Sequence, residues 1–379
     1  MKRAPRVIAL LLALVTAALL PSWWCGRDAE AWLDADPATQ ARLADALIAF
    51  EAEDDRTRAS LTPAANRFAG EWALVTHQMA ALGLAQLCLA RPPDCARYVP
   101  TITAAAVKSF LPEMRDFGTH GWSEDVLATL EGSHGHAYFG YPALAVSMAR
   151  VLDPAFPREI AAQHDAVIAA FERRLLASPT GLIETYPNES YPTDVASVAA
   201  AIAVHGRING ADHRKVIAHW AERVRSAQID PASGLTIQRM GARDGKPHDA
   251  PRGSGTGLAA YFAGFADRPT AELLTAGLRR QQASFLGFGG IREYAPGHSG
   301  KGDVDSGPVL LGISVSATGF ALAPLRAFGH RDDFTRIYRT TALFGVPFEG
   351  GASARFLTGG AIGNALLLAL LTSGPELAP

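Results

Sequence analysis

The chain has 379 residues, of which 48% are hydrophobic and 19% are charged, so it can bury a large core and is not a disordered protein. Its 35 Lys and Arg residues nearly balance its 37 Asp and Glu residues, and no basic run is interleaved with aromatic residues. This balance excludes nucleic acid as the expected partner.

The N-terminus has the pattern of an export signal. Lys2, Arg3 and Arg6 precede an unbroken apolar stretch over residues 7–20, which is short for a membrane span. The small-residue sequence Ala29-Glu30-Ala31 lies rather far beyond this stretch. The segment is therefore either a cleaved secretory signal or an N-terminal membrane anchor.

This pattern sets the expected domain organisation and location. We expect a signal or anchor over 1–31 and a single domain over 32–379, in a protein that is exported to the periplasm or anchored in the inner membrane. In an oxidising compartment Cys88 and Cys95, which flank a turn between two helical patterns, either form a local disulfide or stay unpaired.

Most of the remaining chain has the apolar periodicity of helices. Apolar residues recur at three- and four-residue spacing, and the alternating stretches typical of strands are few. Twelve helices, and hence six hairpins, are expected. They cover 36–53, 66–90, 99–117, 136–152, 157–176, 191–208, 211–228, 253–266, 269–285, 306–326, 332–344 and 360–373.

The connections between these helices alternate in length. Those after the even-numbered helices are short and make antiparallel neighbours. Those before the even-numbered helices are long and rich in Gly, Pro, His, Tyr and acids. They cover 118–135, 177–190, 229–252, 286–305 and 345–359.

The two sets of helices also differ in polarity. Even-numbered helices are small and apolar all round, as in 194–205, which indicates burial. Odd-numbered helices carry charge on one face, as in 160–176. The expected fold class is therefore all-α, an (α/α)6 barrel or toroid of six helical hairpins; an open α-solenoid is the alternative, but no repeated motif is present.

In such a barrel the long loops surround the N-terminal ends of the inner helices, which favour polar and anionic groups. The first of these loops and the start of the helix after it contain Trp122, His134, His136 and Tyr141 among glycines and aromatic residues. The histidines are candidates for acid–base groups. Their spacing is a weak metal signal without further ligands, so no metal is expected, and loop packing is the alternative.

The second loop has the strongest chemical signal. Its acids and tyrosines lead directly into an apolar inner helix, an arrangement that suits general acid–base catalysis. Glu184 or Asp194 is the candidate base, and N-capping is the alternative for part of the set. The candidate residues are Glu184, Tyr186, Asn188, Glu189, Tyr191 and Asp194.

The third and fourth loops supply further polar candidates. Arg252 lies in a glycine-rich stretch that no strand precedes, so phosphate binding is not expected there, but the guanidinium can orient a substrate. In the fourth loop Asp303 and Asp305 form a carboxylate pair that lacks the remaining acids of a calcium loop. One acid is expected to cap a helix and the other to face the cavity, with two plain caps as the alternative. The other candidates are Glu293, Tyr294 and His298.

Several of these stretches resemble the linalool dehydratase/isomerase family. The similarity runs through Tyr138–Leu144 (YFGYPAL), Gly181–Ile183 with Pro187-Asn188, Ile229–Leu235 (IDPASGL) and Gly302–Gly307 (GDVDSG), in a shared order. It covers about two-thirds of the chain. The resemblance implies an exported α/α-barrel enzyme that dehydrates and isomerises small monoterpene alcohols without a cofactor.

The chain departs from that family at the chemical groups. The family has two active-site cysteines flanking the Pro-Asn stretch, where this sequence has Glu184 or Thr185 and Asp194 or Val195, and Tyr141 replaces a family histidine. The resemblance therefore implies a related acid–base reaction carried out by carboxylates and tyrosines.

These observations predict a cofactor-independent lyase or isomerase acting on a small hydroxylated, terpenoid-like substrate. A glycan-active α/α-barrel enzyme (hydrolase, lyase or epimerase) and a non-catalytic ligand-binding protein are the alternatives, and self-association into a homo-oligomer is left open. The expected catalytic residues are Glu184, Asp194, Tyr186, Asp305 and His136. The expected substrate-binding residues are Trp122, His134, Tyr141, Asn188, Glu189, Tyr191, Arg252, Glu293, Tyr294, His298 and Asp303.

Overall fold

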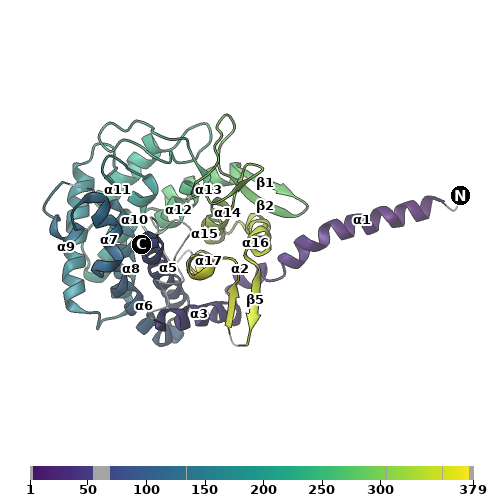
Figure 1. Cartoon of the computed structure of the whole chain (residues 1–379), viewed down its shortest axis with the longest axis horizontal. Helices are drawn as coiled ribbons and strands as arrows, with labels where there is room; N and C mark the ends of the chain where they lie inside the picture. Colours follow the sequence, from purple (N-terminus) through teal and green to yellow (C-terminus); the bar gives the residue numbers. More distant parts are fainter. Residues whose placement is uncertain (1–2, 54–68, 134, 304, 352, 375–379) are drawn as a thin grey trace.

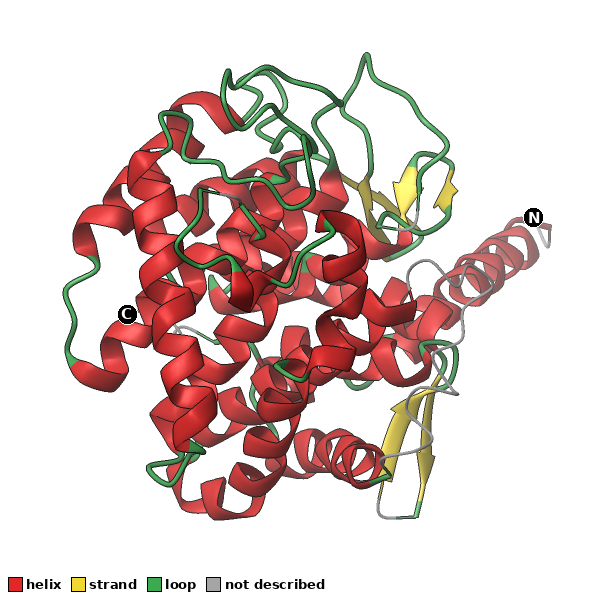
Figure 2. Cartoon of the chain, turned by 60° about the vertical axis from the view of Figure 1, so that its left-hand side comes forward, coloured by secondary structure: helices red, strands yellow, loops and turns green. Residues whose placement is uncertain are grey.

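The protein is a toroid of helices in two concentric layers (Figures 1 and 2). The structure is a computed structural model that describes residues 3–53, 69–133, 135–303, 305–351 and 353–374. An inner ring of helices is surrounded by an outer ring, and the chain alternates between the two. The predicted all-α, (α/α)6-barrel fold is confirmed.

The inner ring closes on itself, because each inner helix packs against the next in chain order and the last packs against the first. Its helices are rich in Ala and Gly, which lets their backbones approach closely: a Cβ at Gly140 would collide with Ser197 Oγ on the neighbouring helix. The inner helices are α5 (Ala69–Ala90), α8 (Gly140–Leu152), α10 (Pro192–Asn209), α12 (Gly253–Ala263), the pair α14 (Val315–Phe320) and α15 (Leu322–Ala327), and α17 (Gly360–Thr372).

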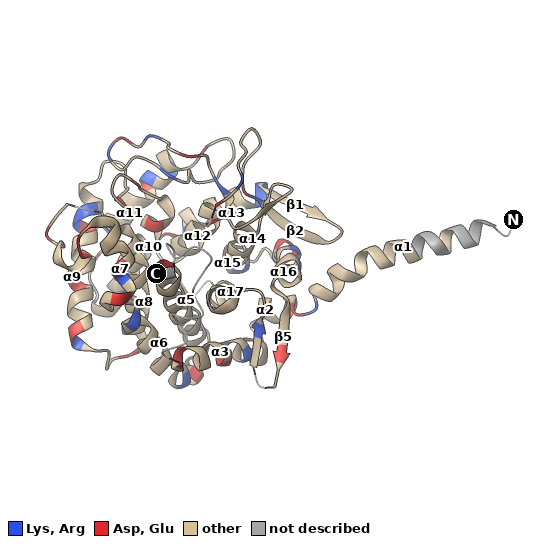
Figure 3. Cartoon of the chain, viewed as in Figure 1, with Lys and Arg blue, Asp and Glu red and all other residues tan. Residues whose placement is uncertain are grey.

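The outer ring carries most of the charge, whereas the inner helices are nearly free of it (Figure 3). This division follows from burial, since only one face of an outer helix contacts protein. The outer helices are α3 (Pro37–Ala52), α6 (Cys95–Ser109), α7 (Pro112–Trp122), α9 (Arg158–Ala177), α11 (Arg214–Arg223), α13 (Arg268–Arg280) and α16 (Arg331–Gly345). Short helical turns are η2 (Pro92–Asp94), η3 (Val126–Ala128), η4 (Ala137–Phe139) and the π-helical η5 (Val224–Gln228).

Two small antiparallel sheets interrupt the helical pattern, and the sequence did not predict them. One has the order β1-β2-β4-β3 and the other is the hairpin β5–β6. The strands are β1 (Gln282–Phe285), β2 (Phe288–Arg292), β3 (Val309–Leu310), β4 (Ile313–Ser314), β5 (Pro347–Gly350) and β6 (Ser353–Phe356).

Three expected helix boundaries are corrected by these features. The helix expected over 269–285 ends at Arg280, because its last residues form β1 and then turn at Leu286 and Gly287, both with positive φ. The helix expected over 306–326 begins only at Val315, after the β3–β4 hairpin. The helix expected over 99–117 is divided into α6 and α7 immediately before Pro112, because proline cannot continue a helical hydrogen-bond ladder.

The buried apolar side chains of the described residues form one main cluster, which runs from Ala29 to Leu371. A disulfide between Cys88 and Cys95 joins the end of α5 to the start of α6. The segment Gly70–Ala90 of α5 is long and apolar enough to cross a membrane. Because 83% of its most apolar 18-residue stretch is buried inside the toroid, it is a core helix.

The N-terminal segment has two parts. Helix α1 (Arg3–Cys25) projects away from the toroid, whereas the short α2 (Ala29–Leu33) packs into it (Figure 1). Ala29 and Trp32 belong to the main core cluster. The folded body therefore includes residues that precede the expected domain start at residue 32.

Candidate active site

The long loops lie at one end of the toroid, where the inner helices begin. They cover residues 123–139, 178–191, 229–252, 281–314 and 346–359. The sequence predicts five long loops in these places, but it gives shorter bounds for the fourth, 286–305, and places the first at 118–135. Glu71, Tyr141 and Asp194 each lie in the first turn of an inner helix, and so these three polar side chains come from neighbouring helices at the same end. This end is the natural place for a polar site.

Asp194 is held by hydroxyl groups on both of its oxygens. Tyr141 donates a hydrogen bond of 2.8 Å to Oδ1, and Thr185 donates one of 2.7 Å to Oδ2. Burial raises the pKa of Asp194 to about 6, although both hydrogen bonds act in the opposite direction. Asp194 is therefore a fixed carboxylate that titrates close to neutral pH.

Glu71 is a functional candidate that the sequence prediction missed. It lies at the start of α5, and Tyr186 donates a hydrogen bond to it. Burial and the charges of Asp194 and Asp305 raise the pKa of Glu71 to about 8. Glu71 is therefore protonated at neutral pH. In this state it can act as a proton donor.

Asp305 comes from the loop between β2 and β3. Its side chain is accessible to solvent, yet the surrounding protein atoms and the charges of Asp303 and Asp194 raise its pKa to about 6. Gln238 Nε2 lies 3.5 Å from Asp305 Oδ2, and Gln238 Oε1 is buried with no hydrogen-bond partner among the described residues. Asp305 is thus a carboxylate that a bound molecule can reach.

Glu71, Asp194 and Asp305 form one electrostatically coupled group, which we call the acid cluster. The charges of Asp194 and Asp305 act on Glu71 and on Tyr141, and the charge of Asp194 acts on Asp305. Carboxylates that share a site cannot all ionise at the same pH, so their pKa values separate. Such a group can supply a proton donor and a proton acceptor together.

Arg252 supports the loop that carries Asp305. Its Nε donates to Glu293 Oε1 at 2.6 Å, and its Nη1 and Nη2 bind the two carboxylate oxygens of Asp303 at 2.5 and 2.9 Å. Asp303 in turn accepts hydrogen bonds from the backbone N–H groups of Asp305 and Ser306, and Tyr294 stacks on the guanidinium. Asp303 thus shapes the loop, although no helix begins there, and Asp305 belongs to the acid cluster.

Replacing Arg252 by methionine is expected to destabilise the protein. Glu293 is fully buried and would lose its guanidinium partner, which typically costs about 3–5 kcal/mol. Urea unfolding of Arg252→Met measures this loss, with Arg243→Met, an exposed arginine of the preceding loop, as the control. Addition of Glu293→Gln should recover part of the stability, and wild-type stability of the single variant would contradict the supporting role.

The structure places Glu184 away from the acid cluster. In the segment that precedes α10, Thr185 donates to Asp194, whereas the neighbouring Glu184 lines a different part of the surface. Glu184 instead lines a separate pocket of about 530 Å³ together with Arg173 and Arg174 of α9. It is not retained as the base in the function proposed below.

His136 and Trp122 also lie outside the acid cluster. His136 is fully buried, its Nε2 lies 3.1 Å from Glu124 Oε1, and its ring packs on that of Trp122 with centroids 4.3 Å apart. Trp122 Nε1 donates to the carbonyl oxygen of Thr185 at 2.9 Å. Both residues therefore position the loop that presents Thr185. The remaining candidate of this loop, His134, lies outside the described residues.

The other predicted binding residues are spread along the rim. Asn188 is exposed and has a φ of +63° in the turn between Tyr186 and Glu189. Its role is to adopt the left-handed backbone conformation that this turn requires. The Tyr191 hydroxyl donates to Glu189 Oε2 at 2.9 Å, and Asp194 acts on Tyr191 electrostatically. His298 is exposed, and its charge acts on Asp230 rather than on the acid cluster.

One group of described side chains has the composition of a metal site. His164, Asp165 and His205 offer ligand atoms that lie within 4.8 Å of one another. The guanidinium of Arg150, however, donates to both Asp165 Oδ1 and His164 Nδ1, at 2.5 and 2.8 Å. His205 lies eleven residues beyond Asp194 on α10, or about 16 Å along the helix. The positively charged side chain of Arg150 therefore occupies the place that a metal ion would take, and the group is remote from the acid cluster.

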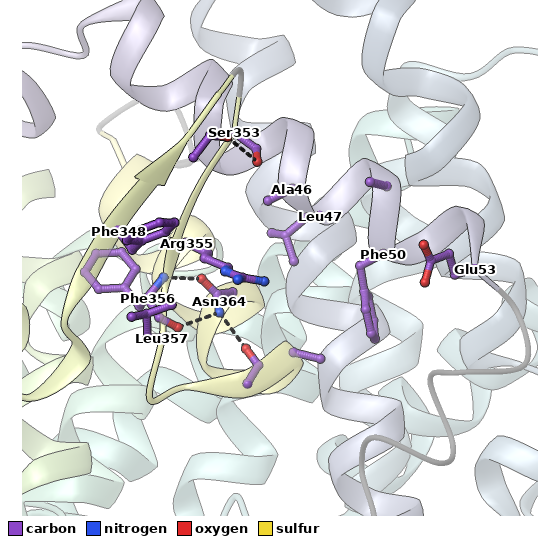
Figure 4. Close-up of a pocket in the computed structure, with 14 residues that line it drawn as sticks. Ala46, Leu47, Phe50, Glu53, Phe348, Ser353, Arg355, Phe356, Leu357 and Asn364 are labelled. Atoms are coloured by element: carbon purple, nitrogen blue, oxygen red, sulfur yellow. Dashed lines mark hydrogen bonds between the residues drawn. The ribbon is translucent and has the colours of Figure 1, made fainter.

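A pocket of about 740 Å³ lies between α3, the β5–β6 hairpin and the start of α17 (Figure 4). Asn364 closes one wall by donating to the carbonyl oxygen of Phe356 and accepting from its N–H group. The other wall presents Leu47 and Phe50. The acid cluster is the stronger candidate, since shifted pKa values concentrate at functional sites.

Comparison with known proteins supports the fold. The solved structure of the GH76A α-1,6-mannanase from Salegentibacter sp. HEL1_6 is similar, with a TM-score of 0.50 and 12% identity over 87% of this chain and 98% of that chain. An inactive variant of that enzyme in complex with α-1,6-mannotetrose has a TM-score of 0.49 and 13% identity over 89% of this chain and 99% of that chain. A family 88 glycosyl hydrolase from Bacteroides vulgatus has a TM-score of 0.34 and 13% identity over 65% of this chain and 72% of that chain. No family model and no curated protein matches the sequence.

These comparisons correct the family resemblance. The protein is an α/α toroid of the kind seen in an α-1,6-mannanase, whereas the sequence motifs indicated a linalool dehydratase/isomerase. The short motifs misled because they lie in turns and loop-to-helix junctions that any toroid of this kind needs: Gly181 and Gly234, for example, occupy positive-φ positions. The terpenoid lyase/isomerase expectation and the corresponding family assignment are wrong.

Proposed function

We propose that the protein is a carbohydrate-active enzyme that cleaves glycosidic bonds at the acid cluster. The observation that carries this proposal is the separation of pKa values among three carboxyl groups at one end of the toroid: Glu71 near 8, Asp194 near 6 and Asp305 near 6. Glycoside cleavage needs one protonated and one ionised carboxyl group on either side of the bond. The likeness in fold to a mannanase is in keeping with this chemistry.

The charge of the acid cluster favours a neutral glycan over an acidic one. Arg252 lowers the pKa of Asp305, but Glu293 and Asp303 already bind its guanidinium. A uronic acid or phosphate group would therefore meet the negative charge of the acid cluster. The hydroxyls of Tyr141 and Tyr186 instead suit hydrogen bonding to sugar hydroxyls.

In the proposed reaction Glu71 donates its proton to the glycosidic oxygen as the bond from that oxygen to the anomeric carbon breaks. A water molecule adds to the anomeric carbon and gives a proton to Asp305, which solvent can reach. Asp194, fixed by Tyr141 and Thr185, stabilises the positive charge that develops on the sugar and keeps Glu71 protonated.

A ligand screen separates this proposal from its alternatives. Neutral oligosaccharides, with α-1,6-mannotriose as the first probe, are expected to raise the melting temperature, because a ligand at 100 times its Kd stabilises by about 2.7 kcal/mol. Uronate oligosaccharides and monoterpene alcohols of similar concentration serve as controls and should give no shift. A shift with a terpenoid alcohol and none with any sugar would contradict the proposal.

A further inference from the structure

Helix α1 carries large apolar side chains that are exposed to solvent. The exposed fractions are 58% for Leu14, 55% for Val15, 43% for Leu19 and 55% for Leu20. Adjacent positions on a helix are separated by about 100°, so these side chains point to several sides of α1. A helix that is apolar all round and exposed needs an apolar surrounding rather than a partner along one stripe.

The dimensions and flanks of α1 match a lipid bilayer. The sequence from Val7 to Trp24 has no charged residue, and 18 residues of helix span about 27 Å, close to the hydrocarbon thickness of a membrane. Trp23 and Trp24, exposed by 63% and 59%, lie at the end next to the toroid, where an aromatic belt would meet the interface. Basic residues lie beyond the other end.

The end of α1 and the residues after it are part of the folded body. Ser22, Ala29 and Trp32 are exposed by 3%, 0% and 4%. Arg326 Nε donates to the carbonyl oxygen of Trp32 at 2.9 Å, and Arg331 pairs with Asp34 at 2.8 Å. Cleavage at the small residues 29–31 would cut through α2 and remove core side chains, which argues against a signal that is cleaved at this point.

The surface around the base of α1 exposes further apolar side chains beside the charged pair Arg27–Asp28. The tip of the β1–β2 hairpin exposes 77% of Phe285 and 42% of Leu286, and it touches α1, since a Cβ at Gly287 would lie 2.6 Å from Ser22 Oγ. The neighbouring β3–β4 hairpin exposes 52% of Leu310 and all of Leu311. Figure 1 shows that α1 leaves the toroid on the side where β1 and β2 lie.

We propose that α1 is retained as a single membrane-spanning anchor and that the two hairpin tips, Phe285–Leu286 and Leu310–Leu311, dip into the same bilayer surface. The basic residues at the N-terminal end of α1 stay on the cytoplasmic side, so the toroid lies on the opposite face of the membrane. The Cys88–Cys95 disulfide agrees with that oxidising side. The enzyme then acts at the membrane surface, with its orientation fixed at more than one point.

Fractionation of the full chain tests the anchor. We expect the protein in the membrane fraction after high-salt and alkaline carbonate washes, its release by detergent, and an intact mass that includes α1. Val15→Arg, which places a charge in the spanning segment, should move the protein out of the carbonate-resistant fraction. A soluble wild-type protein whose N-terminus begins after residue 20 would overturn the proposal.

A fluorescence measurement tests the hairpin contact separately. In a Cys25→Ser background, an environment-sensitive dye on Phe285→Cys should show a blue-shifted, several-fold brighter emission in phospholipid vesicles, which an added brominated lipid quenches. The matched control is Leu273→Cys on α13, exposed by 38% on the outer ring and expected to show no such change. Equal emission and quenching at the two positions would overturn the hairpin contact while the anchor is judged by fractionation alone.

Discussion

Substituting Asp305 by asparagine is expected to lower the kcat on a neutral oligosaccharide by about 10²–10⁴-fold, the usual contribution of a positioned acid–base group. Asparagine has the same shape but cannot accept the proton that the attacking water releases. Because Asp305 is accessible and its only side-chain hydrogen bond among the described residues is the long one from Gln238, the helical circular-dichroism spectrum and the melting temperature should change little. KM should change less than kcat.

Two comparisons make this test specific. Glu131→Gln, an exposed acid of another rim loop, is the control and should retain wild-type activity. Glu184→Gln discriminates between the sequence expectation and the structure, since the former requires a large loss and the position of Glu184 beside Arg173 and Arg174 predicts none. Full activity of Asp305→Asn would remove Asp305 from the mechanism.

The activity of the wild-type enzyme should follow a bell-shaped pH profile. Asp194 and Asp305 must be ionised, which requires a pH above about 6, and Glu71 must be protonated, which requires a pH below about 8. The two limbs belong to the coupled acid cluster, and the maximum should lie near pH 7. A profile that stays flat through pH 9 would exclude Glu71 as the acid.

Glu71→Gln should change both the rate and the shape of this profile. Glutamine can keep the hydrogen bond with Tyr186 but cannot give up a proton, so hydrolysis of the natural bond should fall by about 10²–10⁴-fold. An aryl glycoside with a very acidic leaving group needs no proton, so its hydrolysis should be much less affected and should no longer decline above pH 8. An equal loss on both substrates would indicate a structural role instead.

The same substitution links activity to stability. The pKa of Glu71 is raised in the folded state, so its contribution is present below the unfolded pKa, near 4.5, and is lost as the pH rises through about 8. Glutamine does not ionise and should therefore stabilise the protein relative to wild type at pH 9, but not at pH 5. This comparison identifies Glu71 as the titrating group without use of any substrate.

The fold could be predicted because it follows from periodicity. Six pairs of helices, short links between neighbours and apolar inner helices are all visible in the spacing of apolar residues, as in 194–205. The strands could not be predicted, because a short apolar run such as Val309–Ser314 fits a buried helix as well as a hairpin. The turn at Leu311 and Gly312, with φ of 52° and 82°, decides the outcome and has only a weak sequence signal.

The site was predicted less well than the fold. Asp194, Asp305, Tyr141 and Tyr186 are brought together, but Glu184 lines a separate pocket with Arg173 and Arg174. Which of the neighbouring residues Glu184 and Thr185 reaches Asp194 depends on the local path of the backbone, which the sequence does not reveal. Glu71 was not predicted because it lies inside a helix and not in a polar loop. It had a detectable signal, since it is the one Asp, Glu, Lys or Arg residue in the 22-residue helix α5.

A crystal structure of the Glu71→Gln variant soaked with a neutral oligosaccharide, with α-1,6-mannotriose as the first choice, tests the central claim most directly. The account predicts a glycosidic oxygen within hydrogen-bond distance of the side-chain amide that replaces the acid, and an anomeric carbon between Asp194 and Asp305. Sugar bound only elsewhere, in the pocket beside Glu184 or between α3 and the β5–β6 hairpin, would contradict it.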